Sequence, residues 1–358
     1  MSRLLCVKEK VIRIYFNAMK RFLLFCLLVS STLSFSQTIR GKVFDEKNLP
    51  LPGANVYFDG TTIATITDEN GVFALNSGSK INSILAISFI GYQTQYTKTF
   101  DSNTELIIVL KESVNTLKEV VITKDRFSRA DKLKLFREQF LGQTKYGKKA
   151  VIENEADIDF QYDEKSRTLK AFSDKPLIIQ NTVLGYKITY ELVDFEVNFW
   201  KISMYSADVT KSFYAGLSRF EEVKKDSKIL KEREKCYRGS QLHFFRNLAN
   251  GIWNRENFQL FKGSYVVNAS EYFTVSDSPD ELKKVVVAKT YKGLNANKIV
   301  AEFNTLFDGK DQSKIIFGTD TFYVDKFGNN TNIESIMFAG ILTKNKFGGV
   351  LPVNYGID

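Results

Sequence analysis

Residues 51–75 read LPGANVYFDGTTIATITDENGVFAL, and this stretch decides the fold of the first part of the chain. Three apolar residues at every second position predict a strand with one buried face: Ala54, Val56 and Phe58. Asn55 and Tyr57 alternate with them, so they are expected on the opposite, exposed face.

Turn residues separate that strand from its neighbours. Pro52-Gly53 precedes it and Asp59-Gly60 follows it; proline presets φ and glycine supplies the turn. Asn70-Gly71 stands between two alternating runs and predicts a β-hairpin, since both residue types accept positive φ. Asp68 and Glu69 are residue types that bind calcium, but the sequence around them lacks the spacing of an EF-hand loop. It is therefore interpreted as a turn held by local side-chain hydrogen bonds.

Seven short strands are expected between residues 38 and 111, in the runs TIRGKVF, ANVYF, TIATIT, GVFAL, SILAISFIGY, QTQYTKTF and TELIIVLK. Short strands with regularly spaced turns are typical of an antiparallel β-sandwich. For the whole chain we predict a mainly β fold with a helical insertion. A seven-stranded antiparallel sandwich is followed by a larger antiparallel β-rich domain.

The turn and strand residues of this region, taken in order, resemble the carboxypeptidase-like regulatory domain family. The residues that carry the resemblance are Gly41, Pro52, Gly53, Ala54, Val56, Gly60, Thr67, Asp68, Gly71, Phe73, Gly91 and Tyr92. The resemblance implies a transthyretin-like or immunoglobulin-like sandwich over residues 38–111, without catalytic activity. It also implies an N-terminal position in exported Gram-negative bacterial proteins, including TonB-dependent outer-membrane transporters.

Residues 19–36 read MKRFLLFCLLVSSTLSFS and have the three parts of a secretory signal peptide. Lys20 and Arg21 precede an apolar run that is too short for a membrane span, and small residues follow it. Cleavage is expected near Ser36 or Gln37. Residues 1–18 are interpreted as a gene-start extension. A lipoprotein anchor at Cys26 is not favoured, because that residue lies inside the apolar run.

Removal of residues 1–36 changes two inferences. Cys6 and Cys26 are removed with this segment, so the mature chain retains Cys236 alone. A single cysteine cannot form an intrachain disulfide, and none is expected. The removed part carries a net charge of +5, which leaves +4 of the total of +9. This charge gives little reason to expect nucleic acid as a partner. We expect an unidentified envelope protein or ligand instead, and no cofactor.

Residues 112–142 are expected to link two domains through a strand and a helix. The run LKEVVIT, residues 117–123, resembles the stretch that joins such a sandwich to the plug of a TonB-dependent transporter. The remaining chain is too short for a large transporter barrel. The helix is predicted to begin at the cap Ser128, to present Leu133, Phe136 and Phe140 on one face, and to end at Gly142.

Residues 143–358 are predicted to form a β-rich domain that a helical segment, residues 220–250, interrupts. A break is expected at Arg238-Gly239-Ser240, and the apolar face of the segment comprises Leu242, Phe245 and Leu248. Three motifs resemble the C-terminal part of exported carboxypeptidase-regulatory-like proteins, without bringing an assigned activity. They are Tyr237-x-Gly239-Ser240 leading into His243-Phe244-Phe245, Gly328-Asn329, and Leu351-Pro352-x-x-Tyr355.

Catalytic, cofactor and metal sites are not expected. A zinc carboxypeptidase needs two histidines, and this chain has His243 alone. Ser240 and His243 are helical i,i+3 neighbours, yet no orienting acid is readable, so a helix break is the preferred interpretation. Four acidic residues at alternate positions are expected to form a solvated stripe on one strand: Glu153, Glu155, Asp157 and Asp159.

These observations favour an exported, non-enzymatic protein of the periplasm or outer membrane. Its sandwich serves as an interaction or spacer module, and its C-terminal domain binds an unidentified partner or ligand. Two alternatives stay open. The C-terminal strands alternate and carry many aromatic residues, as small outer-membrane β-barrels do. Acidic residues that meet only in three dimensions would instead form the site of a hydrolase.

Overall fold

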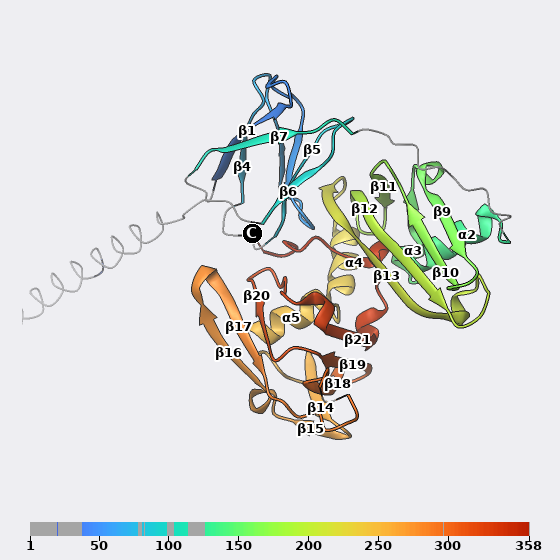
Figure 1. Ribbon diagram of the computed structural model, residues 1–358. Helices are drawn as coiled ribbons and strands as arrows, with labels where there is room; N and C mark the ends of the chain where they lie inside the picture. The colour runs from blue at the N-terminus through green and yellow to red at the C-terminus, as the bar shows by residue number, and fades with distance from the viewer. Residues whose placement is uncertain are drawn as a thin grey trace, which may run out of the picture.

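The computed structural model describes Lys20 and residues 38–77, 81, 83–98, 104–113, 126–295 and 297–357 (Figure 1). The predicted extension, the signal peptide apart from Lys20, and the run LKEVVIT lie outside these residues. The fold is mainly β with a few helices, as the sequence predicts. No helix in the described residues is long and apolar enough to cross a membrane.

In the described residues of the N-terminal part, seven strands form the sandwich, as predicted. They are β1 (Thr38–Asp45), β2 (Asn55–Phe58), β3 (Ala64–Ile66), β4 (Val72–Asn76), β5 (Leu85–Ser88), β6 (Gln95–Thr97) and β7 (Leu106–Leu110). One sheet has the order β4-β1-β7 and the other the order β3-β2-β5-β6. The strand pairs are antiparallel with one exception: β1 and β7 run parallel, so the first and last strands of the sandwich lie side by side.

Two expectations for the sandwich are wrong. Tyr57, expected on an exposed face, is buried, because Leu217 from the next part of the chain packs with it and with Ala86. Asn70-Gly71 forms a turn but no hairpin, since the strands on its two sides, β3 and β4, belong to different sheets. Gly71 has a φ of 72°, and an added Cβ would lie 2.5 Å from the Val43 carbonyl oxygen, so this turn requires glycine.

The next part of the chain packs two helices, α2 (Arg129–Phe140) and α3 (Lys145–Lys149), against a six-stranded sheet. Its strands are β8 (Ala150–Ile152), β9 (Asp159–Asp163), β10 (Thr168–Phe172), β11 (Leu177–Asn181), β12 (Tyr186–Phe199) and β13 (Val209–Glu222). Ser128 caps α2 by accepting a hydrogen bond from the Asp131 N–H, as predicted. Phe136 and Phe140 are buried against Phe195 and Tyr190, which fixes α2 on the sheet.

The helical segment predicted over residues 220–250 starts later, because β13 continues to Glu222. It consists of α4 (Ser227–Tyr237) and α5 (Gln241–Ala249), and the predicted break between them is present. Gly239 provides the break with a φ of 76°. Leu248 and Phe245 of α5 are buried as expected, whereas Leu242 is only partly buried.

Two further sheets, with orders β15-β14-β18-β19-β21 and β16-β17-β20, surround α5 and share one apolar cluster with it. Their strands are β14 (Phe258–Lys262), β15 (Tyr265–Val267), β16 (Phe273–Ser278), β17 (Leu282–Val287), β18 (Ala301–Phe307), β19 (Asp311–Phe317), β20 (Thr321–Val324) and β21 (Ile336–Gly340). The region predicted as one β-rich domain therefore contains two separate apolar clusters, and the first of them also includes Phe347 and Leu351.

The last residues of the chain return across the molecule, and Figure 1 shows the C terminus between the sandwich and the other sheets. A short 3₁₀ turn, Phe347–Gly349, places the Phe347 ring parallel to that of Phe140, with centroids 5.0 Å apart. An added Cβ at Gly348 would lie 2.6 Å from the Gly147 Cα, so this approach depends on glycine. The end of the chain thus completes a core that forms far earlier in the sequence.

Truncation of Phe347 tests this packing. We expect Phe347→Ala to lower the free energy of unfolding by about 3–5 kcal/mol, because a buried aromatic side chain would leave a cavity. Val350→Ala, at an exposed position three residues away, is the matched control and should change it by less than about 1 kcal/mol. Urea unfolding measures both. Equal effects of the two substitutions would contradict the packing of the tail into this core.

Candidate interaction surfaces

The family-signature residues lie at the turns and in the core of the sandwich. Thr67 Oγ1 donates a hydrogen bond to the Leu51 carbonyl oxygen (2.5 Å) and accepts one from the Ala54 N–H (2.9 Å). Asp68 Oδ1 accepts from two backbone N–H groups of its own turn, as the sequence predicts. The other members are in the core (Gly41, Val56, Phe73), at or beside turns (Pro52, Gly53, Gly71, Gly91, Tyr92) or at a junction described next (Gly60).

The loop after β2 joins the sandwich to the edge of β13. The Gly60 N–H donates to the Ser218 carbonyl oxygen (2.7 Å), and the Phe220 N–H donates to that of Thr61 (2.9 Å). These two bonds make a short parallel bridge between Thr61 and Arg219. The loop therefore covers part of a sheet edge that would otherwise present unpaired backbone groups.

A partly buried carboxylate lies at this junction. Asp59 Oδ1 accepts hydrogen bonds from the Ser218 N–H (2.6 Å) and hydroxyl (3.2 Å). Burial raises the pKa of Asp59, and the hydrogen bonds from Ser218 oppose that rise. Arg219 Nη1 donates to Asn55 Oδ1 (3.0 Å) nearby. These directional contacts fix the register of the sandwich on β13.

The C-terminal tail, residues 350–357, reinforces the same junction. The Val353 N–H donates to the Gly60 carbonyl oxygen (2.8 Å). The Asn354 amide donates to Thr62 Oγ1 (2.8 Å) and accepts from the Thr62 N–H (3.1 Å). Ile357 packs against the apolar core of the sandwich. The tail thereby contacts the sandwich through both backbone and side chains.

Arg246 of α5 holds the tail from the other side. Its Nε donates to the carbonyl oxygen of Phe327 (3.0 Å), Nη1 to that of Tyr355 (2.8 Å) and Nη2 to that of Val353 (2.7 Å). The guanidinium also lies over the Tyr237 ring, 5.2 Å from its centroid. A planar fork of donors suits this arrangement, and a lysine ammonium does not reproduce it.

The histidine and the nearby serine support the α4–α5 break. Ser240 Oγ accepts from the His243 N–H (3.2 Å), and His243 Nδ1 accepts from the Gly239 N–H (3.2 Å). Burial lowers the pKa of His243 to about 4, and the positive charges of Arg238 and Arg246 add to this effect. The imidazole is therefore neutral at pH 7 and is engaged in backbone bonding.

The acidic stripe expected over residues 153–159 is wrong. The chain turns after β8, and Glu155–Asp157 forms a 3₁₀ turn before β9 begins, so the four carboxylates do not lie along one strand. Glu155 pairs with Arg137, and Asp157 pairs with Lys175 at 2.9 Å. Within the described residues, no group of three or more His, Cys, Asp and Glu side chains is placed to hold a metal ion.

Cys236 is buried against the 3₁₀ turn Phe347–Gly349. Its Sγ donates to the Gly349 carbonyl oxygen (3.0 Å), and burial raises the pKa of the thiol to about 12. A thiol with this pKa carries almost no thiolate at neutral pH and is a poor nucleophile.

The outer face of the β4-β1-β7 sheet exposes apolar side chains. Ile107 and Val109 of β7 are 60% and 43% exposed, and they share this face with Lys42 and Phe44 of β1. The β3-β2-β5-β6 sheet contacts β13, because Tyr57 of β2 packs against Leu217. The exposed face with Ile107 and Val109 belongs to the β4-β1-β7 sheet, which does not make this contact through Tyr57. Apolar side chains gathered on an exposed sheet face are typical of an interaction surface.

The junction residues Tyr57, Asp59 and Arg246 are not evident from the sequence pattern. Of the three, only Tyr57 could have been recognised from the sequence, because a large aromatic residue on the outward face of a strand often packs against another part of the protein. Asp59 and Arg246 resemble ordinary surface charges, because their partners lie far away in the sequence.

Titration of His243 tests its buried, neutral state. Its pKa is about 4 in the folded protein and 6.5 ordinarily, so the unfolded chain binds more protons between these values. We expect the contribution to stability to be complete above pH 6.5. The free energy of unfolding should fall by about 3 kcal/mol as pH falls from 6.5 toward 4. His243→Asn keeps an acceptor for the Gly239 N–H, and its stability profile should lack this component. Parallel profiles for the two proteins, from urea unfolding at each pH, would contradict the assignment.

Comparison with known proteins identifies the sandwich. The CarboxypepD_reg-like domain family matches residues 39–122. The TonB-dependent receptor SusC of Bacteroides thetaiotaomicron is 40% identical over 85 residues, which cover 24% of this chain and 8% of the receptor. The TonB-dependent receptor P39 of Formosa agariphila is 31% identical over 100 residues, which cover 28% of this chain and 9% of the receptor.

Among solved structures, a chain of a type II cohesin–X-dockerin complex from Acetivibrio cellulolyticus is 21% identical, with a TM-score of 0.19. The match covers 21% of this chain and 58% of that chain. The chain spans less than a tenth of the length of the two receptors, and the similarity is confined to its N-terminal part. Residues 39–122 therefore contain a CarboxypepD_reg-like domain, as the signature residues predict.

Proposed function

We propose that this chain is an exported, non-enzymatic protein of the cell envelope whose sandwich docks a protein partner. The N-terminal signal pattern and the sandwich shared with TonB-dependent receptors support export and an envelope location. The periplasm and the periplasmic side of the outer membrane are the proposed compartments. The rest of the chain serves as the body to which the sandwich is fixed.

The exposed outer face of the β4-β1-β7 sheet is the observation that carries this proposal. Ile107 and Val109 project from β7, and in the described residues β7 pairs with β1 alone within its sheet. A partner strand added beside β7 would gain backbone hydrogen bonds and would contact these side chains. Lys42 lies next to them and forms an ion pair with Glu105 (3.6 Å), so both charges lie at the edge of the proposed docking face.

The histidine, cysteine and acidic side chains considered as catalytic groups are buried, hydrogen-bonded or ion-paired within the fold. His243 is neutral and bonded to the helix break, Cys236 is buried with a raised pKa, and the carboxylates of Glu155 and Asp157 are paired with basic side chains. These contacts favour a structural role for each group over a hydrolytic site.

Site-specific photo-crosslinking in the native host tests the docking face. We expect a photo-reactive phenylalanine analogue at Ile107 to give a discrete higher-mass adduct, since that side chain would face the partner. The same analogue at Tyr265, an exposed position on β15, should give none. Val109→Lys should abolish the Ile107 adduct, because a charge would be buried in the interface.

Fractionation of the same cells separates two kinds of failure. If the analogue at Ile107 gives no adduct in the chain without Val109→Lys, while the mature chain is in the envelope fraction, docking at this face is refuted and export is not. Recovery of an uncleaved chain in the cytoplasmic fraction would refute export itself.

A further inference from the structure

The hairpin between β12 and β13 presents a cluster of exposed large side chains at its tip. Trp200, Ile202 and Tyr205 are 57%, 42% and 73% exposed. The tip lies at the end of the hairpin opposite α4, at the lower right of the green sheet in Figure 1, away from the sandwich. The tip is therefore separate from the proposed docking face.

A network around Asp208 holds this tip in one conformation. Asp208 Oδ1 accepts from the Trp200 indole N–H (2.9 Å) and pairs with the Lys201 ammonium (3.2 Å). Its Oδ2 accepts from the Ser203 hydroxyl (2.6 Å), and these hydrogen bonds and the Lys201 charge lower the pKa of Asp208. Ser206 bonds to Glu138 of α2. An ordered tip loses little conformational entropy on binding.

The same network decides which chemistry the tip offers. The indole N–H of Trp200 and the hydroxyl of Ser203 are already bonded inside the loop, so the exposed part of the indole is hydrocarbon. A sugar-binding platform would need free polar groups beside the ring to meet the hydroxyls. These groups point inward to Asp208, which disfavours a carbohydrate ligand.

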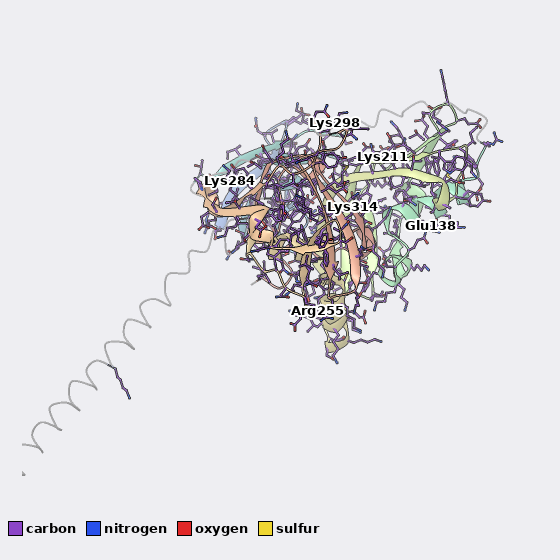
Figure 2. The ribbon with its side chains drawn as sticks, turned by 90° about the horizontal axis from the view of Figure 1, so that it is seen from below. Glu138, Lys211, Arg255, Lys284, Lys298 and Lys314 are labelled. Carbon is purple, nitrogen blue, oxygen red and sulfur yellow. The ribbon has the colours of Figure 1, made fainter. Side chains whose placement is uncertain are left out.

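Positive charge borders the apolar side chains. The Lys201 ammonium lies 4.6 Å from the Trp200 ring centroid, and exposed Lys211 follows at the start of β13 (Figure 2). Two acidic groups lie beside them: Asp208, which pairs with Lys201, and Glu138, labelled in Figure 2, which is bonded to Ser206. Tryptophan and tyrosine with adjacent lysine on a protruding loop match the chemistry of an anionic membrane–water interface.

We propose that residues 200–205 form a membrane anchor that inserts Trp200, Ile202 and Tyr205 into the headgroup region of an anionic lipid bilayer. Lys201 and Lys211 then contact the lipid phosphates. The indole and phenol rings occupy the interface, where amphipathic aromatic groups are favoured, and the Ile202 side chain reaches the acyl boundary. This inference concerns a surface other than the docking face and does not depend on the partner proposed for the sandwich.

Tryptophan fluorescence tests the anchor directly, because the chain has two tryptophans, Trp200 and Trp253. Trp253 stacks on Phe273, so Trp253→Phe leaves Trp200 as the single reporter. Vesicles of phosphatidylglycerol and phosphatidylethanolamine should shift its emission to the blue, and brominated lipids should quench it. Vesicles of phosphatidylcholine alone should give a weaker response, since the lysines lose their anionic partners.

Variants separate the anchor from general adhesion. Ile202→Asp leaves the Asp208 network intact and should weaken co-sedimentation with anionic vesicles by roughly tenfold. Val266→Asp, at an exposed apolar position on β15, is the matched control and should bind as the parent does. An unshifted Trp200 emission, or equal binding by both variants, would overturn the proposal. A response to native envelope membranes that pure lipid vesicles do not reproduce would also overturn it, in favour of a protein partner.

Discussion

The contact of Arg246 with three carbonyl oxygens is the interaction on which the arrangement of the molecule depends. One guanidinium joins α5, the turn at Phe327 and the C-terminal tail, and that tail reaches the sandwich at Gly60 and Thr62. Carbonyl oxygens so close to a charged donor form strong, directional hydrogen bonds. Without this fork, the tail would keep its hydrogen bonds to Gly60 and Thr62 but would lose its hydrogen bonds to α5.

This constraint explains how a chain with several apolar clusters presents fixed surfaces. Phe347 completes the core under β12 and β13, and Ile357 contacts the core of the sandwich. The tail and the β13 edge thus hold the sandwich by one side, and the outer face with Ile107 and Val109 stays exposed. The hairpin tip with Trp200 projects from the far end of the same β13. The β12–β13 pair therefore carries the hairpin tip at one end and contacts the sandwich at the other.

The sequence predicts the local features and misses the long-range ones. The strands of the sandwich, the Ser128 cap and the break at Gly239 follow from periodicity and turn chemistry, which act over a few residues. Tyr57 and the acidic run of residues 153–159 are mispredicted, because a distant partner and an unexpected turn decide their positions. Tyr237, Gly328 and Tyr355 belong to the C-terminal motifs whose resemblance to other exported proteins stays a prediction. All three lie against Arg246, which no local pattern indicates.

Hydrogen exchange on an Arg246→Lys variant tests the role of this junction most directly. Lysine keeps the charge but loses the fork, whereas Arg238→Lys, at a position that donates to Glu256 and not to the tail, is the matched control. We predict faster exchange of the Val353 and Gly60 amides in Arg246→Lys alone, with the β18–β19 amides unchanged in both. Unchanged protection of Val353 and Gly60 would contradict the claim that Arg246 fixes the tail and, through it, the sandwich.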